Sequence, residues 1–561
     1  MRHPLEFGSR SCNILSAVTL LLAAAPAAFG FQVVADRCGG SGDLRLINGK
    51  IHTMAATDTV VSEVTVQDGK ITAIGSTGDQ RRGPCTQTID LGGRTVVPGL
   101  IDNHNHIVLL GLRPGYDTRL ETAASIADVQ TLIRARALVV PANGFITAMG
   151  GWNQVQFKEK RMPTLAELDA ADPTHPVIVY QAFTGPAATN TLGKRFFADK
   201  GVAVSEAGLI AANAPSVAAL NALRAVQTFE DKKRGTLDAM RYVASVGLTT
   251  NVDMGAFLPP GMENAQDSFT FDGLATTNPF TMYDAFNALH AENKMLTRLR
   301  IFFLSMDTRP DVPMLANRLR NTFNGLGDDT LRVSGIGEFA TSWPLFGQVT
   351  APANYETALQ LIAKQGWAFQ QHSTSLAEDQ LTAATFEKVN AVTPIKDLRW
   401  SVAHVPKINL ETINRFKAIG AAIAVHPFEY LAGGPNAGPP LRTILDSGIR
   451  VGAGSDAAQI STLNPWLILY YMVTGKNSSG VLINAGQQVS REEAIKLYTR
   501  DNGWFLREED KLGSLELGKL GDVVVLSDDY FDPAKVSDEG IKTIKSVLTV
   551  VGGKVVYRTL P

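Results

Sequence analysis

The chain has 561 residues, of which 45% are hydrophobic, 19% charged and 7% aromatic. At about 100–200 residues per domain, this length suits a large barrel with an added module and exceeds one simple domain. The formal net charge of −2 removes the electrostatic reason to expect nucleic-acid binding, because no basic excess is available to neutralise phosphates. The apolar content supplies a sizeable core and argues against a disordered chain.

Residues 1–30 have the layout of a secretory signal peptide. Arg2 and Arg10 give a positive start, residues 14–25 are almost entirely apolar, and small residues follow. The apolar run is shorter than the ~20 residues that a membrane-spanning helix needs, although an uncleaved anchor is the alternative. We therefore expect export to the periplasm or the exterior, with no membrane span in the mature protein.

The cysteines bear on the redox state of the exported chain. Cys12 would leave with the signal peptide, whereas Cys38 and Cys85 would remain. An even pair in an oxidising compartment makes a disulfide plausible, and two unpaired thiols are an equal alternative. The pair forms no CxxC motif and so predicts no zinc–thiolate site.

Both ends of the mature chain consist of short β-like runs. In the N-terminal part, Asp68-Gly69 separates two alternating apolar runs, which is a strong hairpin signal. Near the C-terminus, β-branched runs return at 523–526 and 547–551. We expect one discontinuous β-sandwich module built from 31–97 and 505–561.

Between these ends, over residues 98–504, strand-like and helix-like segments alternate. Helical periodicity follows several strands, as at 377–389 and 410–419. The pattern predicts a (β/α)8 barrel of the TIM type. A long insertion after the first strand, at about 109–244, is expected to lie over the active-site face. The eight candidate strands are 100–103, 249–253, 299–304, 332–338, 367–372, 400–404, 421–426 and 450–456.

Polar residues gather at the carboxyl ends of these strands, where the active sites of such barrels lie. A His-x-His pair on an extended strand places both imidazoles on one face. Five of the nine histidines occupy strand ends, so we favour a shared metal site over separate structural roles. The strand-end residues are Asp102, His104, His106, Glu338, His372, His404, His426 and Asp456.

Imidazoles mixed with carboxylates suit a borderline-soft divalent ion, with zinc as the first choice and one or two ions bound. Such an ion lowers the pKa of a bound water to about 7. A strand-end aspartate beside it is suited to accept the water's proton and to pass it to a leaving group. The sequence thus predicts a metal-dependent hydrolytic site.

Several motifs resemble the amidohydrolase superfamily. Residues 97–106 (VPGLIDNHNH) resemble its opening motif, 454–456 (GSD) its eighth-strand motif, and 513–522 (GSLELGKLGD) its C-terminal signature. With Gly151-Trp152 and 163–169 (PTLAELD), the chain is similar to the YtcJ-like branch, often called amidohydrolase family 3. The resemblance implies an acid/base role for Asp456 and metal ligands at His104, His106, His372, His404 and Asp456.

The chain departs from this family pattern at the end of the fourth strand. Many relatives have a lysine, often carboxylated, where this chain has Gly337 followed by Glu338. Glutamate offers the same two oxygens and one negative charge on a shorter arm. Glu338 is therefore expected to bridge two metals, to bind one, or to sit nearby.

Four further residues are candidates for the substrate pocket. His426 stands where relatives usually have a glutamine before a proline, and it is expected to contact substrate or to line the mouth of the site. Trp152, Trp343 and Tyr430 are candidates for the pocket wall, with ordinary packing as the alternative.

The leading hypothesis is an exported metal-dependent hydrolase that acts on a small molecule. Its expected target is a non-peptide C–N bond in an amide, formamide, carbamate or cyclic amide. One alternative is a single-metal deaminase of an amino-heterocycle, and another is a non-catalytic binding protein on the same fold. The complete ligand set argues against the binding protein. The sequence predicts no particular oligomeric state.

Overall fold

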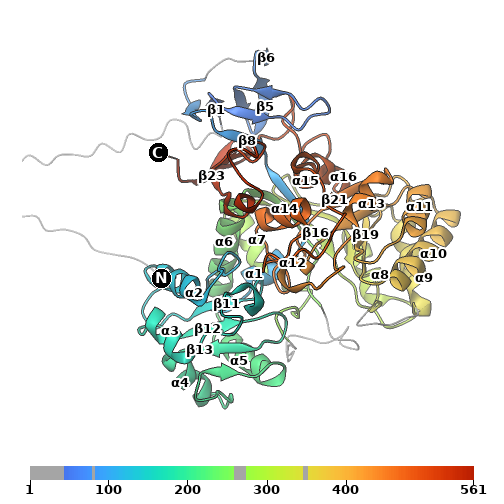
Figure 1. Ribbon diagram of the computed structural model, residues 1–561. Coiled ribbons are helices and arrows are strands. Elements are labelled where there is room, and N and C mark those ends of the chain that lie inside the picture. The colour runs from blue at the N-terminus through green and yellow to red at the C-terminus, as the bar shows by residue number, and fades with distance from the viewer. Residues whose placement is uncertain (1–42, 79–82, 258–272, 345–350, 561) are drawn as a thin grey trace, which may run out of the picture. The chain divides into compact units, whose positions relative to one another are not determined.

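The computed structural model describes residues 43–78, 83–257, 273–344 and 351–560 (Figure 1). The predicted signal peptide and Cys38 lie outside these residues. Cys85 is disulfide-bonded. None of the helices within the described ranges has the length and apolar character needed to cross a membrane.

Eight parallel strands form a nearly closed barrel with the order β21-β20-β19-β18-β17-β16-β15-β9. This confirms the predicted (β/α)8 architecture, and each strand overlaps one of the eight expected segments. The strands are buried on both faces, which is why they read as apolar runs without alternation. Their bounds are β9 (Leu100–Asn105), β15 (Leu248–Asp253), β16 (Arg298–Phe303), β17 (Leu331–Glu338), β18 (Phe369–Ser373), β19 (Ser401–His404), β20 (Ala422–Val425) and β21 (Val451–Ala453).

The seam between β9 and β21 is closed by side-chain bridges. Asn502 Nδ2 donates to the carbonyls of Ile101 (2.6 Å) and Ala453 (2.7 Å), and its Oδ1 accepts from Ala453 N–H. A carboxamide can serve both strands because it carries two donors and an acceptor. Beyond it, Asp456 N–H donates to the His104 carbonyl at 2.8 Å. The closure therefore fixes the two strand ends that carry His104 and Asp456.

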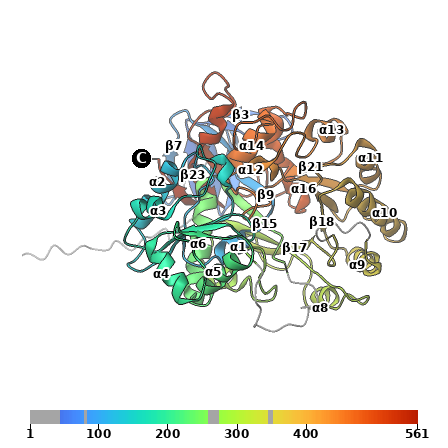
Figure 2. The same ribbon diagram turned by 60° about the horizontal axis from the view of Figure 1, so that its bottom comes forward.

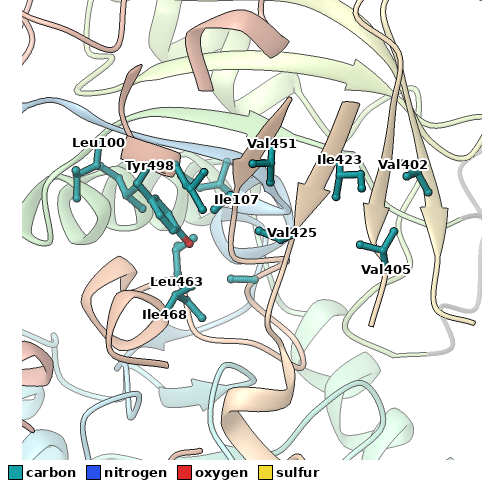
Figure 3. Close-up of a cluster of buried hydrophobic side chains, with 14 of the residues drawn as sticks. Leu100, Ile107, Val402, Val405, Ile423, Val425, Val451, Leu463, Ile468 and Tyr498 are labelled. Carbon is teal, nitrogen blue, oxygen red and sulfur yellow. The ribbon is translucent and has the colours of Figure 1, made fainter. Parts of the chain in front are cut away.

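Helices cover the outside of the barrel, and two of them, α1 and α14, are buried along almost their whole length. Within the core, Val402, Ile423 and Val451 are paired in register across β19, β20 and β21 and form one row of the packing (Figure 3). The barrel helices are α1 (Ile107–Gly111), α6 (Phe229–Ser245), α7 (Asp284–Ala291), α8 (Pro313–Asn321), α9 (Ala353–Lys364), α10 (Leu376–Val392), α11 (Leu410–Ala418), α12 (Glu429–Ala432), α13 (Leu441–Asp446), α14 (Pro465–Thr474), α15 (Arg491–Leu497) and α16 (Arg500–Phe505).

Two sheets made from both ends of the chain share a second core. One has the order β6-β5-β4-β1-β7, and the other, β24-β23-β22-β8-β2-β3, interleaves N- and C-terminal strands. The Asp68-Gly69 hairpin joins β4 to β5, with both turn residues at positive φ. The strands are β1 (Leu44–Ile47), β2 (Lys50–His52), β3 (Val60–Val61), β4 (Val64–Gln67), β5 (Lys70–Ile74), β6 (Thr77–Gly78), β7 (Gln87–Asp90), β8 (Thr95–Pro98), β22 (Val523–Leu526), β23 (Ser546–Val551) and β24 (Lys554–Arg558).

Buried ion pairs tie barrel strands to the C-terminal segment. Arg298 Nη2 lies 2.7 Å from Asp522 Oδ1, and Arg300 Nε lies 2.6 Å from Glu508 Oε2. Arg332 Nη1 reaches the other oxygen of Glu508 at 2.6 Å. The bidentate arginine contacts satisfy charges that would be costly to leave unpaired in the interior.

The segment between β9 and β15 builds a sheet of its own, with the order β10-β11-β12-β13-β14. Figures 1 and 2 show α3, α4 and α5 gathered around it. The 3-10 helix η1 (Gln154–Gln156) contacts α12, which follows barrel strand β20. This segment thus reaches the strand-end loops of the barrel. It contains β10 (Tyr116–Asp117), β11 (Ile146–Met149), β12 (Val177–Tyr180), β13 (Ala187–Thr189), β14 (Leu209–Ile210), α2 (Ile126–Ala137), α3 (Leu165–Ala171), α4 (Thr191–Asp199) and α5 (Ala214–Arg224).

Candidate metal centre and active site

Five barrel strands bring four histidines and two carboxylates to one point. β9 carries His104, and His106 follows its end as the N-cap of α1. Strands β17, β18 and β19 contribute one residue each, and the last residue follows β21. Most of these side chains are buried, and His372 is partly exposed. The six residues are His104, His106, Glu338, His372, His404 and Asp456.

Glu338 lies at the middle of this cluster. Its Oε1 is 3.5 Å from His106 Nε2. Its Oε2 is 2.6 Å from His372 Nδ1 and 3.0 Å from His404 Nε2. Oε1 therefore faces the His106 ring, whereas Oε2 faces the rings of His372 and His404 and lies 3.7 Å from His104 Nε2.

Asp456 closes the cluster on the side of the first strand. Its Oδ1 lies 3.5 Å from His104 Nε2 and 3.3 Å from His106 Nε2. Its backbone has a φ of 54°, a left-handed conformation that aspartate tolerates better than most residues. The turn brings the carboxylate back over the strand end toward the histidine pair.

The residues fit a divalent ion. His104 Nε2 is buried and has no hydrogen-bond partner among the described residues, yet it lies 3.7 Å from Glu338 Oε2. Nitrogen and oxygen atoms that each bind one ion at about 2.0–2.2 Å stand roughly 3–4 Å apart, which matches these separations. The candidate ligand sets include His104, His106 and Glu338 on one side, and Glu338, His372 and His404 on the other.

Charge around the cluster supports the same interpretation. Burial opposes ionisation of Asp456 and Glu338, but the surrounding histidines outweigh it and hold the pKa of both carboxyl groups below its usual range. Burial also disfavours protonation of His106, whereas Asp456 and Glu338 raise its pKa to about 9. The two carboxylates thus demand positive charge at their centre, from protons or from a metal ion.

Second partners orient the histidine rings. His106 Nδ1 lies 2.7 Å from the Gly255 carbonyl, and His104 Nδ1 bonds Gln370 Oε1. A proton held on Nδ1 leaves the Nε2 lone pair free for the cluster. Neither partner was predicted. Gln370 precedes His372 by two residues on β18, and period-two alternation could have placed it on the same face.

His426 lies behind the cluster and does not line the cavity described below. Its Nδ1 is 3.0 Å from His404 Nδ1, and its Nε2 is 3.2 Å from Asn103 Oδ1. A chain of these hydrogen bonds fixes the His404 ring with Nε2 toward Glu338. The arrangement assigns His426 a positioning contact. His104, His404 and His426 also form a third set of nitrogens within 4.8 Å of one another.

Asp102 makes its contacts outside the histidine–carboxylate cluster. Its Oδ1 accepts from Ser455 N–H at 2.9 Å and from His104 N–H at 3.2 Å, and its Oδ2 accepts from Ser455 Oγ at 2.5 Å. These bonds join the first strand end to the loop that carries Asp456. Asp102 is therefore a structural brace of the site.

A cavity of about 440 Å³ opens onto the cluster. His106, Glu338, His372 and Asp456 form its reactive wall. Most of the remaining wall is apolar, with polar groups at Thr374, Glu378, Lys407, Glu429 and Gln459. The apolar lining includes Leu109, Phe183, Phe257, Phe339, Phe428 and Ile460.

The three aromatic pocket candidates lie outside the wall of this cavity. Trp343 packs on Tyr355 with ring centroids 4.7 Å apart, and Tyr430 packs on Tyr470 at 6.3 Å. Neither is among the described residues that line the cavity. Trp152 lines a smaller neighbouring cavity of about 280 Å³. Trp343 and Tyr430 thus have the packing contacts that were the alternative for them, whereas Trp152 borders a cavity beside the first one.

Solved structures of metal-dependent hydrolases share this fold. An uncharacterized metal-dependent hydrolase from Pyrococcus furiosus aligns with a TM-score of 0.56 at 18% identity, over 87% of this chain and 100% of that chain. A mutant of atrazine chlorohydrolase from Arthrobacter aurescens TC1, complexed with zinc and atraton, aligns with a TM-score of 0.54 at 16% identity, over 92% and 97% of the two chains.

Relatives in sequence span almost the whole chain. An N-substituted formamide deformylase from Arthrobacter pascens is 21% identical, over 92% of this chain and 98% of the relative. The Bacillus subtilis (strain 168) protein YtcJ, described as an amidohydrolase, is 24% identical over 91% and 98%. The model of the amidohydrolase family matches residues 87–557, which include every residue of the cluster. The chain therefore belongs to the amidohydrolase family of metal-dependent hydrolases.

Proposed function

We propose that this protein hydrolyses the C–N bond of a small N-substituted amide, with a formamide as the preferred case. The observation that carries the proposal is the joint opening of two carboxylates and two imidazoles into one largely apolar cavity of about 440 Å³. The similarity to an N-substituted formamide deformylase supports the formamide preference. The products would be a carboxylic acid and an amine.

A divalent ion, with zinc as the first candidate, would polarise the substrate carbonyl and acidify a water molecule when bound here. Asp456 has the position of the acid/base, because its Oδ1 lies beside both His104 and His106 and its carboxylate lines the cavity. In the proposed reaction it accepts a proton from the attacking water. It then donates that proton to the leaving nitrogen as the C–N bond breaks.

Glu338 is proposed to bridge two ions. Its oxygens face separate imidazole groups, with His106 on one side and His372 and His404 on the other. Metal content per chain, measured by elemental mass spectrometry, should be near two and should fall to one or less in Glu338→Ala. One equivalent in both proteins would contradict a bridging role.

The proposed substrate has an apolar segment directly beside the amide. Phe257, Phe339 and Phe428 line the cavity, and Phe339 stacks on the His372 ring with centroids 5.0 Å apart. An apolar wall beside a polar reacting centre favours a substrate that carries an apolar group next to its reacting amide.

The test is a panel of N-alkyl and N-benzyl formamides, acetamides and amino-heterocycles, with amine and ammonia release followed separately. We expect amine release from formamides and its loss in Asp456→Asn, with fold and metal content retained. Unchanged hydrolysis in that variant would overturn the role of Asp456. Ammonia release from the heterocycles alone would favour deamination instead.

Export is a separate proposal that depends on the first thirty residues. The positive start, short apolar run and small-residue zone support cleavage near residue 30. N-terminal sequencing of the protein from fractionated expression cells should find a mature chain in the periplasm or the medium. A chain that retains Met1 in the cytoplasm would contradict the proposal.

A further inference from the structure

Two cavities meet at a shared wall beside the metal cluster. Phe428, Glu429, Gln459 and Ile460 line both the reaction cavity and the neighbouring cavity of about 280 Å³. The second cavity is completed by barrel residues of α12 and by the segment between β9 and β15. Those lining residues are Trp152, Asn153, Ala182, Leu431, Ala432 and Gly433.

The shared wall carries two polar atoms without hydrogen-bond partners among the described residues. They are Glu429 Oε2 and Gln459 Nε2, and both atoms are buried. Gln459 as a whole is only 2% exposed. Buried polar groups are almost always paired, because an unpaired one costs about 1–3 kcal/mol and a charged one more. Unpaired groups that line a cavity are therefore candidates for ligand recognition.

Burial disfavours the ionised form of the Glu429 carboxyl group, and the nearby charges only partly offset this. Burial raises the pKa of this side chain to about 7, Lys407 opposes the rise and Asp456 adds to it. Lys407 donates from Nζ to the Asn436 carbonyl at 2.8 Å. A cation placed in the second cavity would supply positive charge beside this carboxyl group and so favour its ionised form.

Apolar and aromatic groups surround the two polar atoms. Phe428 and Ile460 belong to the shared wall, and Trp152 is among the residues that line the second cavity. Indole and phenyl faces attract ammonium groups, and the apolar surface accepts a hydrocarbon linker. The second cavity thus combines one acceptor, one donor and an aromatic surface, which suits an alkylammonium group better than an anion.

We propose that Glu429 and Gln459 form a second substrate subsite, which selects amides whose N-substituent ends in a protonated amine. Glu429 accepts a hydrogen bond from the ammonium group, and Gln459 donates from Nε2 to an acceptor on the same substrate. The amide lies in the first cavity, and the linker passes the shared wall. The inference relies on the proposed amide hydrolysis for its reaction, whereas the binding preference stands by itself.

Two compounds of matched size test the subsite. N-formyl-1,4-diaminobutane carries an ammonium end, and N-formylpentylamine replaces that end by a methyl group. Wild type should favour the ammonium compound in kcat/KM, and Glu429→Gln should lower this value by about 10- to 100-fold, as expected for loss of a charged hydrogen bond. The readout is the ratio of kcat/KM between the two compounds, which should fall by the same 10- to 100-fold in Glu429→Gln. An equal fall for both compounds would overturn the proposal.

Binding is measured independently of turnover by calorimetric titration of both compounds into the Asp456→Asn protein, with and without Glu429→Gln. A preference for the ammonium compound that disappears with Glu429→Gln supports the subsite even if wild type hydrolyses neither compound. Hydrolysis of both compounds without any binding preference would overturn the subsite and leave amide hydrolysis standing.

Further variants separate recognition from folding. Glu411→Gln makes the same charge change on the exposed side of α11 and should alter neither compound's kinetics. Gln459→Met removes the donor at similar volume and should weaken binding of both compounds by a similar, smaller factor, because the carbonyl that can accept from Nε2 is common to the two. If Glu429→Gln fails to fold, Glu429→Met, which has similar volume and leaves no polar atom unpaired, carries the test, and an unchanged preference for the ammonium compound in that variant would overturn the proposal.

Discussion

Replacing Asp379 by asparagine is predicted to make the protein more stable relative to wild type as the pH rises. Asp379 lies on α10 and is fully buried. Its Oδ1 accepts a hydrogen bond from Ser373 Oγ at 2.6 Å, whereas Oδ2 has no partner among the described residues. Burial raises the pKa of Asp379 from 3.8 to about 7, although Ser373 opposes the rise. The ionised carboxylate is thus poorly accommodated in the folded state.

The sign and size of the effect follow from linkage. Because the folded pKa exceeds the unfolded one, the folded state holds the proton more tightly, and stability falls as pH rises from about 4 to about 7. The gap between 3.8 and about 7 corresponds to about 4 kcal/mol of unfolding free energy, at about 1.4 kcal/mol per pKa unit. About 2 kcal/mol of this develops between pH 5.5 and pH 8.5. An asparagine at this position does not titrate and therefore adds no such pH dependence to the unfolding free energy.

The measurement is urea unfolding of wild type and Asp379→Asn at pH 5.5, 7 and 8.5. The difference in unfolding free energy should move by about 2 kcal/mol in favour of the variant across this range. Asp510→Asn, at an exposed position, is the control and should show no trend. A difference between wild type and Asp379→Asn that is independent of pH would refute the reasoning about burial.

Three other results are expected. Glu508→Ala should lower the unfolding free energy by about 3–5 kcal/mol in denaturant titrations, because it leaves the buried Arg300 without its carboxylate partner. Adding Arg300→Met should recover much of this loss. If the effects of the two substitutions on the unfolding free energy simply add, the two residues are not energetically coupled. His426→Leu should weaken metal affinity or kcat/KM by about 10- to 100-fold, because leucine cannot accept the hydrogen bond that orients the His404 ring. Wild-type values in both titration and kinetics would contradict the positioning role. Chelation of the divalent ion should lower the unfolding temperature and abolish hydrolysis, with both restored by zinc; an unchanged unfolding temperature would argue against metal in the cluster.

Much of the architecture was predictable because local pattern and tertiary role coincide in it. Buried parallel strands read as apolar runs, and the (β/α)8 repeat makes the position after each run an active-site position. His104 and His106 share a face because strand side chains alternate. Glu338, although it departs from the family's lysine, occupies the end of β17 and could be placed by the same rule.

The partners of these residues depended on contacts between distant segments. Gln370 is 266 positions away from the His104 ring that it orients, and no local pattern relates the two. The shared wall of Glu429 and Gln459 forms only when the loops after β20 and β21 meet the segment between β9 and β15. Trp343 and Tyr430 show a related difficulty, because residue type alone does not distinguish an aromatic side chain of the core from one that lines a pocket.

The sequence by itself therefore determined the barrel, its strand ends and the set of candidate ligands, because each depends on the periodicity of one strand. Only the tertiary structure decided which ring nitrogen faces the cluster, which side chains brace it and where the substrate cavity extends. Those features arise from hydrogen bonds and packing between segments that the chain order keeps far apart.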